Sequence, residues 1–241
     1  MKTEKLRGII IGEQLKGESN KQLIVLAKGV GRVLLSARGA RNAKSKLLAA
    51  TQLFCYADFV VCEGRGFYSV SQAELLNSFY GLRLDMDKLA EAVYLAELTE
   101  RLCPAGMVQD EILELLYYAL SVLEKGTLPP KLVSRIFELK VLQISGLFAP
   151  ESCAVCEETK SPLFFDEQIA EFFCQKHCRK EHVLLLEAVR KAFSFVLEKE
   201  GRAVFGFTLS DEALRQMERI LKRYIEVHMD LRLKSRDFFV L

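Results

Sequence analysis

Four cysteines in two short clusters are the residues of this sequence best suited to chemistry. The clusters read CAVC at 153–156 and CQKHC at 174–178, with seventeen residues between them. A two-residue gap lets two thiolates face one ion, and two such knuckles separated by about 15 to 20 residues are typical of a zinc ribbon. We therefore expect a zinc site that includes Cys153, Cys156 and Cys174.

The fourth ligand of this site has several candidates. The spacing from Cys174 favours His177, whereas the softness of a thiolate and a helical i, i+4 geometry favour Cys178. His182 is also within reach. A closed four-ligand site leaves no open position for water or substrate, so the zinc is expected to be structural. The alternatives are reduced cysteines without a metal, or a redox pair, but the βαβ unit that would carry a redox Cys-x-x-Cys is not visible.

A run of positive charge near the N-terminus is the second feature with functional potential. Between Glu18 and Asp58 the chain has seven basic residues and no acidic one, although its net charge is only +2. Such a run suits phosphate oxygens better than a merely solvated loop. We predict phosphate contact by four residues of one loop and two of the neighbouring hairpin: Arg38, Arg41, Lys44 and Lys46, with Lys28 and Arg32.

Aromatic residues close to this basic run admit two interpretations. Aromatic side chains in such a place can stack on unpaired bases. Strand aromatics more often pack in a core, which is what we expect of this group. The aromatic residues concerned are Phe54, Tyr56, Phe67 and Tyr68.

The basic run itself also has an alternative function, which is binding of an acidic protein partner.

The sequence offers no catalytic constellation. Its three histidines are His177, His182 and His228, and a Ser-His-Asp or Cys-His arrangement would have to borrow the expected metal ligands. There is no phosphate-binding loop of the form G-x-x-x-x-G-K-[ST]. A zinc hydrolase would need three protein ligands and an open coordination position. We therefore expect a protein that is not an enzyme.

Two patterns divide the chain into the elements that position these residues. Residues 6–74 contain five short runs rich in β-branched and aromatic residues, separated by turn residues. This spacing suits a small closed barrel, either an OB-fold or an SH3-like barrel. From about residue 80, apolar residues recur at helical spacing. We expect helices over 87–102, 109–126, 132–146, 183–199 and 210–228.

The expected fold class is α+β with two domains, a barrel over 1–79 and a helical domain over 80–241. Half of the 241 residues are hydrophobic, which is enough to bury a real core. The apolar run near the N-terminus is too short for a signal peptide or a membrane span. An odd number of cysteines argues against a disulfide framework. We expect a soluble, cytoplasmic protein.

Several stretches resemble the bacterial recombinational repair protein family RecO. ESNKQLIVLAKGVGRVLLSARGAR is similar to its barrel motif, and QLFCYADFVVCEGRGFYSVSQAELLNSF to the strands that follow. RIFELKVLQISGLFAP, the knuckles and LKSRDF at 233–238 extend the resemblance over most of the chain. The sequence departs from the family at CQKHC, where many relatives with zinc have a plain Cys-x-x-Cys.

The resemblance implies a five-stranded OB-fold barrel, followed by an all-α domain with an inserted zinc-ribbon-like knuckle pair. It implies a non-enzymatic, nucleoid-associated mediator that binds single- and double-stranded DNA and anneals complementary strands. With RecR, such a protein helps load RecA onto DNA coated by single-strand-binding protein (SSB). The resemblance assigns DNA contact to Arg38 and Arg41, and it places Arg135 and Lys140 near the docked acidic tail of SSB.

Overall fold

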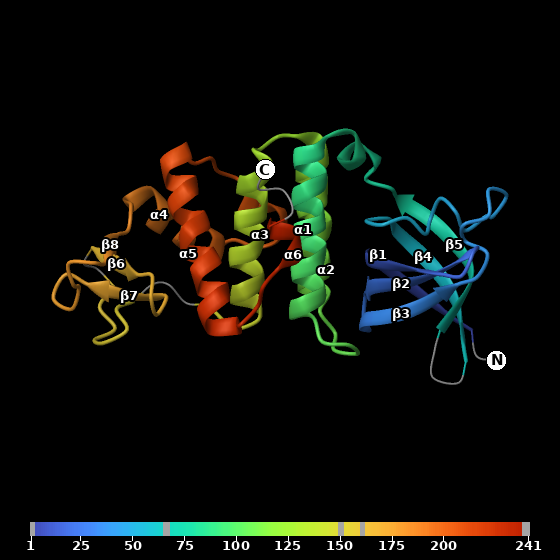
Figure 1. Ribbon diagram of the computed structural model, residues 1–241, viewed down its shortest axis with the longest axis horizontal. Coiled ribbons are helices and arrows are strands. Elements are labelled where there is room, and N and C mark those ends of the chain that lie inside the picture. The colour runs from blue at the N-terminus through green and yellow to red at the C-terminus, as the bar shows by residue number, and fades with distance from the viewer. Residues whose placement is uncertain (1–2, 65–67, 149–151, 160–161, 238–241) are drawn as a thin grey trace.

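The computed structural model describes residues 3–64, 68–148, 152–159 and 162–237. The molecule is elongated: a β-barrel lies at one end, a layer of helices in the middle, and a small three-stranded sheet at the other end (Figure 1). The two groups of residues with functional potential are therefore far apart, because the basic run belongs to the barrel and the cysteines belong to the small sheet.

The barrel closes in the order β1-β2-β3-β5-β4, with β4 pairing back onto β1. Only the β3–β5 pair is parallel, which is the topology of an OB-fold, so this prediction is confirmed and the SH3-like alternative is excluded. Strand β1 pairs with both β2 and β4, and an irregularity between Ile10 and Gly12 interrupts its register at the place where a closed barrel needs a bend. The strands are β1 (Thr3–Lys16), β2 (Asn20–Ala27), β3 (Gly31–Ala37), β4 (Tyr56–Glu63) and β5 (Tyr68–Asn77).

Capping residues mark several of the helix ends. The Asp85 carboxylate accepts the backbone N–H groups of Asp87 and Lys88 at the start of α1, and Ser210 caps α5. Gly126 ends α2 in the left-handed conformation, with φ of 66°. Among the described residues, no helix is long and apolar enough to cross a membrane. The helical segments are η1 (Tyr80–Leu84), α1 (Met86–Leu102), α2 (Asp110–Lys125), α3 (Pro130–Ile144), α4 (Glu187–Glu198), η2 (Gly201–Phe205), α5 (Asp211–Met229) and α6 (Lys234–Asp237).

The small sheet is inserted between α3 and α4. Its strands are β6 (Leu163–Asp166), β7 (Glu171–Cys174) and β8 (Val183–Leu184), in the order β7-β6-β8. The predicted helix over 183–199 was therefore wrong at its start, since Val183 and Leu184 pair with β6 and α4 begins only at Glu187. A short apolar run suits either structure, and the neighbouring strand decided the outcome.

One apolar cluster joins the barrel to the helices. One continuous cluster of buried residues includes Ile9, Leu26 and Phe54 of the barrel together with most buried residues of α1, α2 and α3. The Tyr117 ring of α2 meets the Tyr56 ring edge-on at 5.1 Å. A second cluster fills the barrel interior. The position of the barrel against the helices is therefore set by packing, and no flexible linker separates the two regions.

Candidate metal centre and nucleic-acid interface

Two backbone turns bring the cysteine knuckles together. In the first turn, the Cys153 carbonyl accepts the backbone N–H of Glu157 at 2.8 Å, and the Ala154 N–H donates to the carbonyl of Phe172 on β7, also at 2.8 Å. Cys174 ends β7, and the chain then turns so that the His177 N–H donates to the Cys174 carbonyl at 3.0 Å. Backbone hydrogen bonds thus fix both knuckles beside the same strand.

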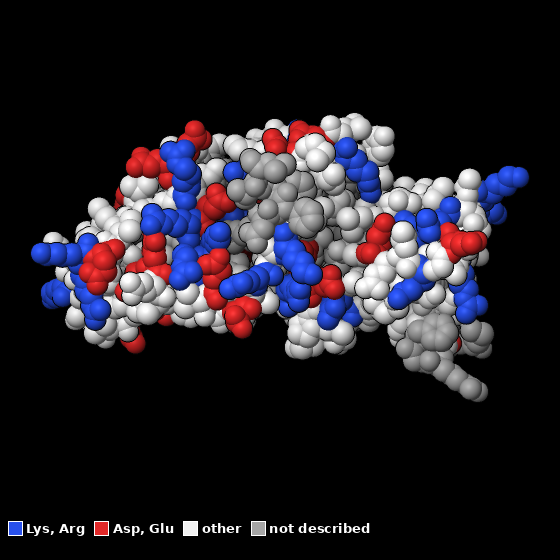
Figure 2. Space-filling view, viewed as in Figure 1, with Lys and Arg blue, Asp and Glu red and all other residues white. Residues whose placement is uncertain are grey.

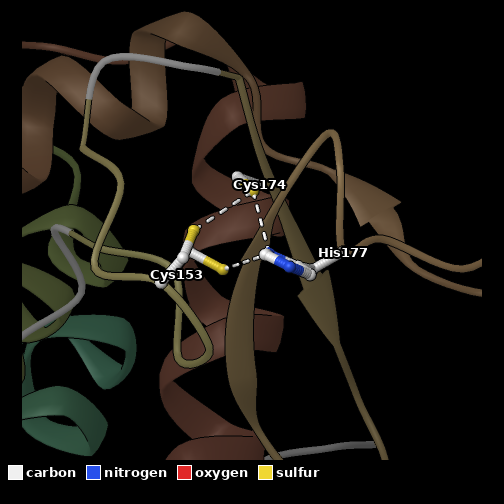
Figure 3. A group of neighbouring side chains, drawn as sticks. Cys153, Cys174 and His177 are labelled. Carbon is white, nitrogen blue, oxygen red and sulfur yellow. Dashed lines mark hydrogen bonds between the residues drawn. The ribbon is translucent and has the colours of Figure 1, made fainter.

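Four side chains from these turns lie close together, and Figure 3 shows three of them, Cys153, Cys174 and His177, pointing toward one another. The ligand atoms of Cys153, Cys156, Cys174 and His177 all lie within 4.8 Å of one another. The Cys156 and Cys174 sulfurs are 3.7 Å apart, and His177 Nδ1 lies 3.6 Å from Cys153 Sγ and 3.3 Å from Cys174 Sγ. Zinc bonds of about 2.3 Å to sulfur and 2.0 Å to nitrogen give tetrahedral edges of about 3.8 Å and 3.5 Å. The donor set therefore fits a tetrahedral metal ion.

The surroundings of Cys153 favour the thiolate that a metal needs. Burial raises the pKa of this thiol, but backbone hydrogen bonds from Cys174, Val155 and Cys156 outweigh burial and lower the pKa to about 6. At Cys156, a backbone hydrogen bond from Glu158 lowers the pKa, but desolvation and the neighbouring sulfurs prevail and raise it. Three sulfurs this close repel one another as thiolates, and a bound cation would relieve that repulsion.

Cys178 and His182 lie outside the cluster. The turn after Cys174 directs the side chain of His177 toward the sulfurs. Cys178 is one residue further along, and its Sγ lies 3.4 Å from the Gln175 carbonyl. His182 Nδ1 accepts the backbone N–H of Arg179, and its Nε2 lies 3.0 Å from a carboxylate oxygen of Asp166. The structure thus brings together four of the six candidate ligands named from the sequence and leaves out Cys178 and His182.

Four of the predicted cations lie exposed on the loop between β3 and β4. Figure 2 shows Lys and Arg side chains at the outer end of the barrel, where Figure 1 places this loop. The Gly39 N–H donates to Asn20 Oδ1 at 2.9 Å, and the Arg41 N–H donates to the Ser19 carbonyl at 3.0 Å. These bonds fasten the loop to the β1–β2 turn. We call the four cations the basic rim: Arg38, Arg41, Lys44 and Lys46.

A groove of about 640 Å³ opens beside the basic rim. It lies on the β2–β3 face, the surface through which OB-folds bind oligonucleotides. Two of the aromatic residues that we expected to pack do so: Phe54 is buried and Tyr56 packs on α2. Tyr68 is half-buried and lines this groove. Phe67 lies outside the described residues. The groove is lined by Gln22, Val33, Leu34, Ser36, Arg38, Glu63, Gly64 and Tyr68.

The other two predicted cations lie at the opposite end of the β2–β3 hairpin. Strand β3 has seven residues, so about 20 Å separates Arg32 from Arg38. Arg32 Nε donates to the Cys103 carbonyl at 2.8 Å, where α1 ends, which is a favourable place for a cation. Lys28 is exposed at the hairpin turn. Arg32 thus belongs to the junction between barrel and helices, away from the basic rim, and phosphate contact by Lys28 and Arg32 stays a prediction.

Arg135, predicted to lie near the tail of SSB, is in the protein interior with only 3% of its surface exposed. Its guanidinium lies 3.0 Å from Glu138, 3.4 Å from Glu218 and 4.0 Å from Glu91, and 4.8 Å from the ring of Tyr94. Burial lowers the pKa of Arg135, but these carboxylates outweigh burial and raise it above its ordinary value. The charge is compensated internally, and an acidic peptide at the surface cannot reach it.

Lys140, the second residue predicted to lie near the tail, is also buried. Its Nζ donates to Gln143 Oε1 at 2.7 Å and to the Leu197 carbonyl at 3.3 Å. Every residue from Leu132 to Leu142 of α3 is buried, so α3 is a central helix with no surface face. Sequence reasoning missed this because it treated charged residues on α3 as exposed. The i, i+3 spacing of Arg135 and Glu138 was the available clue to an internal ion pair.

Comparison with known proteins agrees with this architecture. The family model described as Recombination protein O N terminal matches residues 1–79, and the one described as Recombination protein O C terminal matches residues 83–237. DNA repair protein RecO of Alkaliphilus metalliredigens is 32% identical over 94% of this chain and 94% of its own length. The RecO proteins of Halalkalibacterium halodurans and Acetivibrio thermocellus are 31% and 28% identical, each over 97% of this chain and over 93% and 95% of their own lengths. The chain therefore belongs to the RecO family of DNA repair proteins.

Proposed function

We propose that this RecO family member is a non-enzymatic recombination mediator that binds single- and double-stranded DNA and anneals complementary strands. The family supports a role in recombinational repair, and the exposed basic rim beside the groove of an OB-fold is the observation that carries the DNA-binding proposal. Phosphates of either kind of DNA would contact the rim, because charge neutralisation does not depend on sequence.

Annealing by such a protein needs no bond chemistry. Two strands repel because each phosphate is charged, and a cationic surface that binds both strands reduces this repulsion and raises their local concentration. The mediator would act in the cytoplasm, at the nucleoid, and nucleotide hydrolysis has no part in this scheme.

The proposed partners are RecR and the acidic tail of SSB, with which the protein would help load RecA onto coated DNA. We keep the proposal that the tail docks on the helical domain, but the burial of Arg135 and Lys140 argues that other residues of this domain contact it. The alternative function is a scaffold whose basic rim binds an acidic protein partner, and DNA binding distinguishes the two.

We propose that the metal of the cysteine cluster is zinc with a structural role. Three thiolates and one imidazole in tetrahedral arrangement are a ligand set typical of structural zinc. The ion would fasten the first knuckle to the end of β7, and four protein ligands would leave no position for substrate. Elemental analysis of purified protein tests this: Cys156→Ser should lose most of its zinc. Cys178→Ser is the matched control and should keep it, and zinc loss in the control alone would overturn the ligand set.

The DNA-binding proposal is tested by fluorescence anisotropy of labelled single-stranded DNA across a salt series. The test variant is Arg38→Glu/Arg41→Glu/Lys44→Glu in the basic rim. Removing three phosphate contacts should reduce the slope of log K against log salt by about 2, because each contact with single-stranded DNA contributes about 0.7. The matched control reverses three exposed charges of the helical domain: Lys131→Glu/Lys191→Glu/Arg202→Glu.

The control variant has the same net charge as the rim variant, so a general charge effect would weaken both equally. We expect the control to keep most of the affinity of the wild-type protein and its salt slope. If the two variants bind alike, the basic rim is not the DNA contact surface, and binding of an acidic protein becomes the better explanation of its charge.

A further inference from the structure

We infer that the groove beside the basic rim is a stacking site for an unpaired DNA base, with Tyr68 as the stacking residue. This inference rests on the proposed DNA binding and deepens it, because it assigns the groove to single-stranded DNA. The observations that carry it are the position of Tyr68, the apolar floor of the groove, and the distribution of charge around it.

Residues of four barrel strands, β2, β3, β4 and β5, line the groove. Leu34 and Ser36 of β3 lie on the outer face of the barrel, and Leu34 is 48% exposed. Gln22 of β2 pairs with Ser36, and Tyr68 at the start of β5 pairs in parallel with Leu35. Pairing with the buried Leu35 places the Tyr68 side chain toward the barrel interior at the end of the strands, where it lines the groove together with Leu34. The groove therefore has an aromatic ring and an exposed aliphatic side chain in its wall, both held by a rigid sheet, as a stacking platform needs.

Packing fixes the Tyr68 side chain but buries only part of it. Its side chain packs partly against the core of the barrel and partly lines the groove. Among the described residues, its hydroxyl has no hydrogen-bond partner. A tyrosine with these properties can offer a preorganised aromatic surface to a ligand, since little side-chain entropy is lost when a base binds.

The charges around the groove favour a base over a phosphate inside it. Arg38 lies at one side, and no carboxylate of the described residues lies within ion-pair distance of its guanidinium. Glu63 lines the same groove, and its carboxylate would repel a phosphate but can accept a hydrogen bond from a base amino group. The sugar-phosphate chain would instead follow the rest of the basic rim, while a base turns into the groove.

Such a site distinguishes single strands from duplexes. In a duplex the bases are stacked and paired, so placing one in the groove requires breaking both interactions. The basic rim would hold both kinds of DNA, whereas Tyr68 would add affinity only for unpaired bases. Loss of the ring should therefore weaken single-strand binding, leave duplex binding nearly unchanged, and leave the salt slope unchanged because no phosphate contact is lost.

The chain has no tryptophan, which allows a direct test. In Tyr68→Trp the single tryptophan would lie in the groove, and its fluorescence should be quenched as oligodeoxythymidine binds. The control is Tyr80→Trp, where the native side chain is 60% exposed and lies beyond the other end of β5, about 30 Å away. Trp fluorescence in this control should change little.

Affinity measurements complete the test. Tyr68→Leu should bind a single strand about tenfold more weakly, and Tyr68→Phe should bind as the wild-type protein does. Circular dichroism would verify that both variants are folded. If DNA binds with the expected salt dependence but Tyr68→Leu keeps full affinity for single strands, or the tryptophan in the groove is not quenched, the stacking inference is wrong while the proposed function stands. If wild-type protein binds no DNA, both are wrong.

Discussion

Replacement of Arg135 by methionine would test whether α3 is an internal helix with a self-contained charge network. Glu138 is fully buried, and it lies 3.0 Å from Arg135. Removing the cation takes its positive charge away from this buried carboxylate and from the carboxylates of Glu91 and Glu218. Breaking a buried ion pair on one side costs about 3–5 kcal/mol. For a chain of this size, the midpoint of thermal unfolding should fall by about 10 °C.

A double variant separates the ion pair from simple loss of packing. In Arg135→Met/Glu138→Leu, the buried carboxylate is removed together with its partner, so most of the lost stability should return. The hydrogen bond from the Tyr94 hydroxyl to Glu138 at 2.8 Å is lost as well, which leaves a deficit of about 1 kcal/mol. Urea unfolding followed by circular dichroism measures each step of this cycle.

Two outcomes would refute this reasoning. An Arg135→Met protein within about 1 kcal/mol of the wild type would mean that the guanidinium is not compensating buried charge. A variant that keeps full stability but no longer binds a peptide with the sequence of the SSB tail would show that Arg135 is a surface contact. In either case the description of α3 as a central helix would have to be abandoned.

Three further predictions concern the barrel and its junction with the helices. Gly31→Ala should lower the free energy of unfolding in urea by several kcal/mol. The φ of Gly31 is +88°, and a Cβ atom at this position would lie 1.8 Å from the Met107 carbonyl oxygen. A fully stable variant would contradict this close approach of Gly31 to Met107. Arg32→Leu should reduce thermal stability, while anisotropy should show an unchanged salt slope for DNA, since Arg32 contacts the end of α1; a reduced slope would return Arg32 to the DNA surface. Hydrogen bonding and charge from Arg7 lower the pKa of Asp58 below its ordinary value of 3.8, so the ion pair stabilises the fold fully above that pH and loses its effect as the pH falls further. In Asp58→Asn, the free energy of unfolding should therefore fall less steeply at acid pH than in the wild-type protein. An unaltered dependence on pH would show that the pair contributes nothing to stability.

The sequence by itself determined the barrel strands, most of the helices and the grouping of the cysteines in two knuckles. Alternation of apolar residues predicted the strands of the barrel, and the helical repeat predicted α1, α2, α3 and α5 within a few residues. Knuckle spacing predicted Cys153, Cys156 and Cys174 as neighbours, because a two-residue turn has few conformations. These are local properties, and local sequence is enough to specify them.

The tertiary structure alone decided which charged residues face solvent and which residues share a surface. Arg38 and Arg32 belong to the same basic run, but a strand separates them, and only Arg38 reaches the groove that Tyr68 completes. Arg135 has the composition of a surface residue, yet carboxylates from three different helices surround it. Burial and electrostatic compensation depend on contacts between segments that are distant in sequence, so no local pattern can specify them.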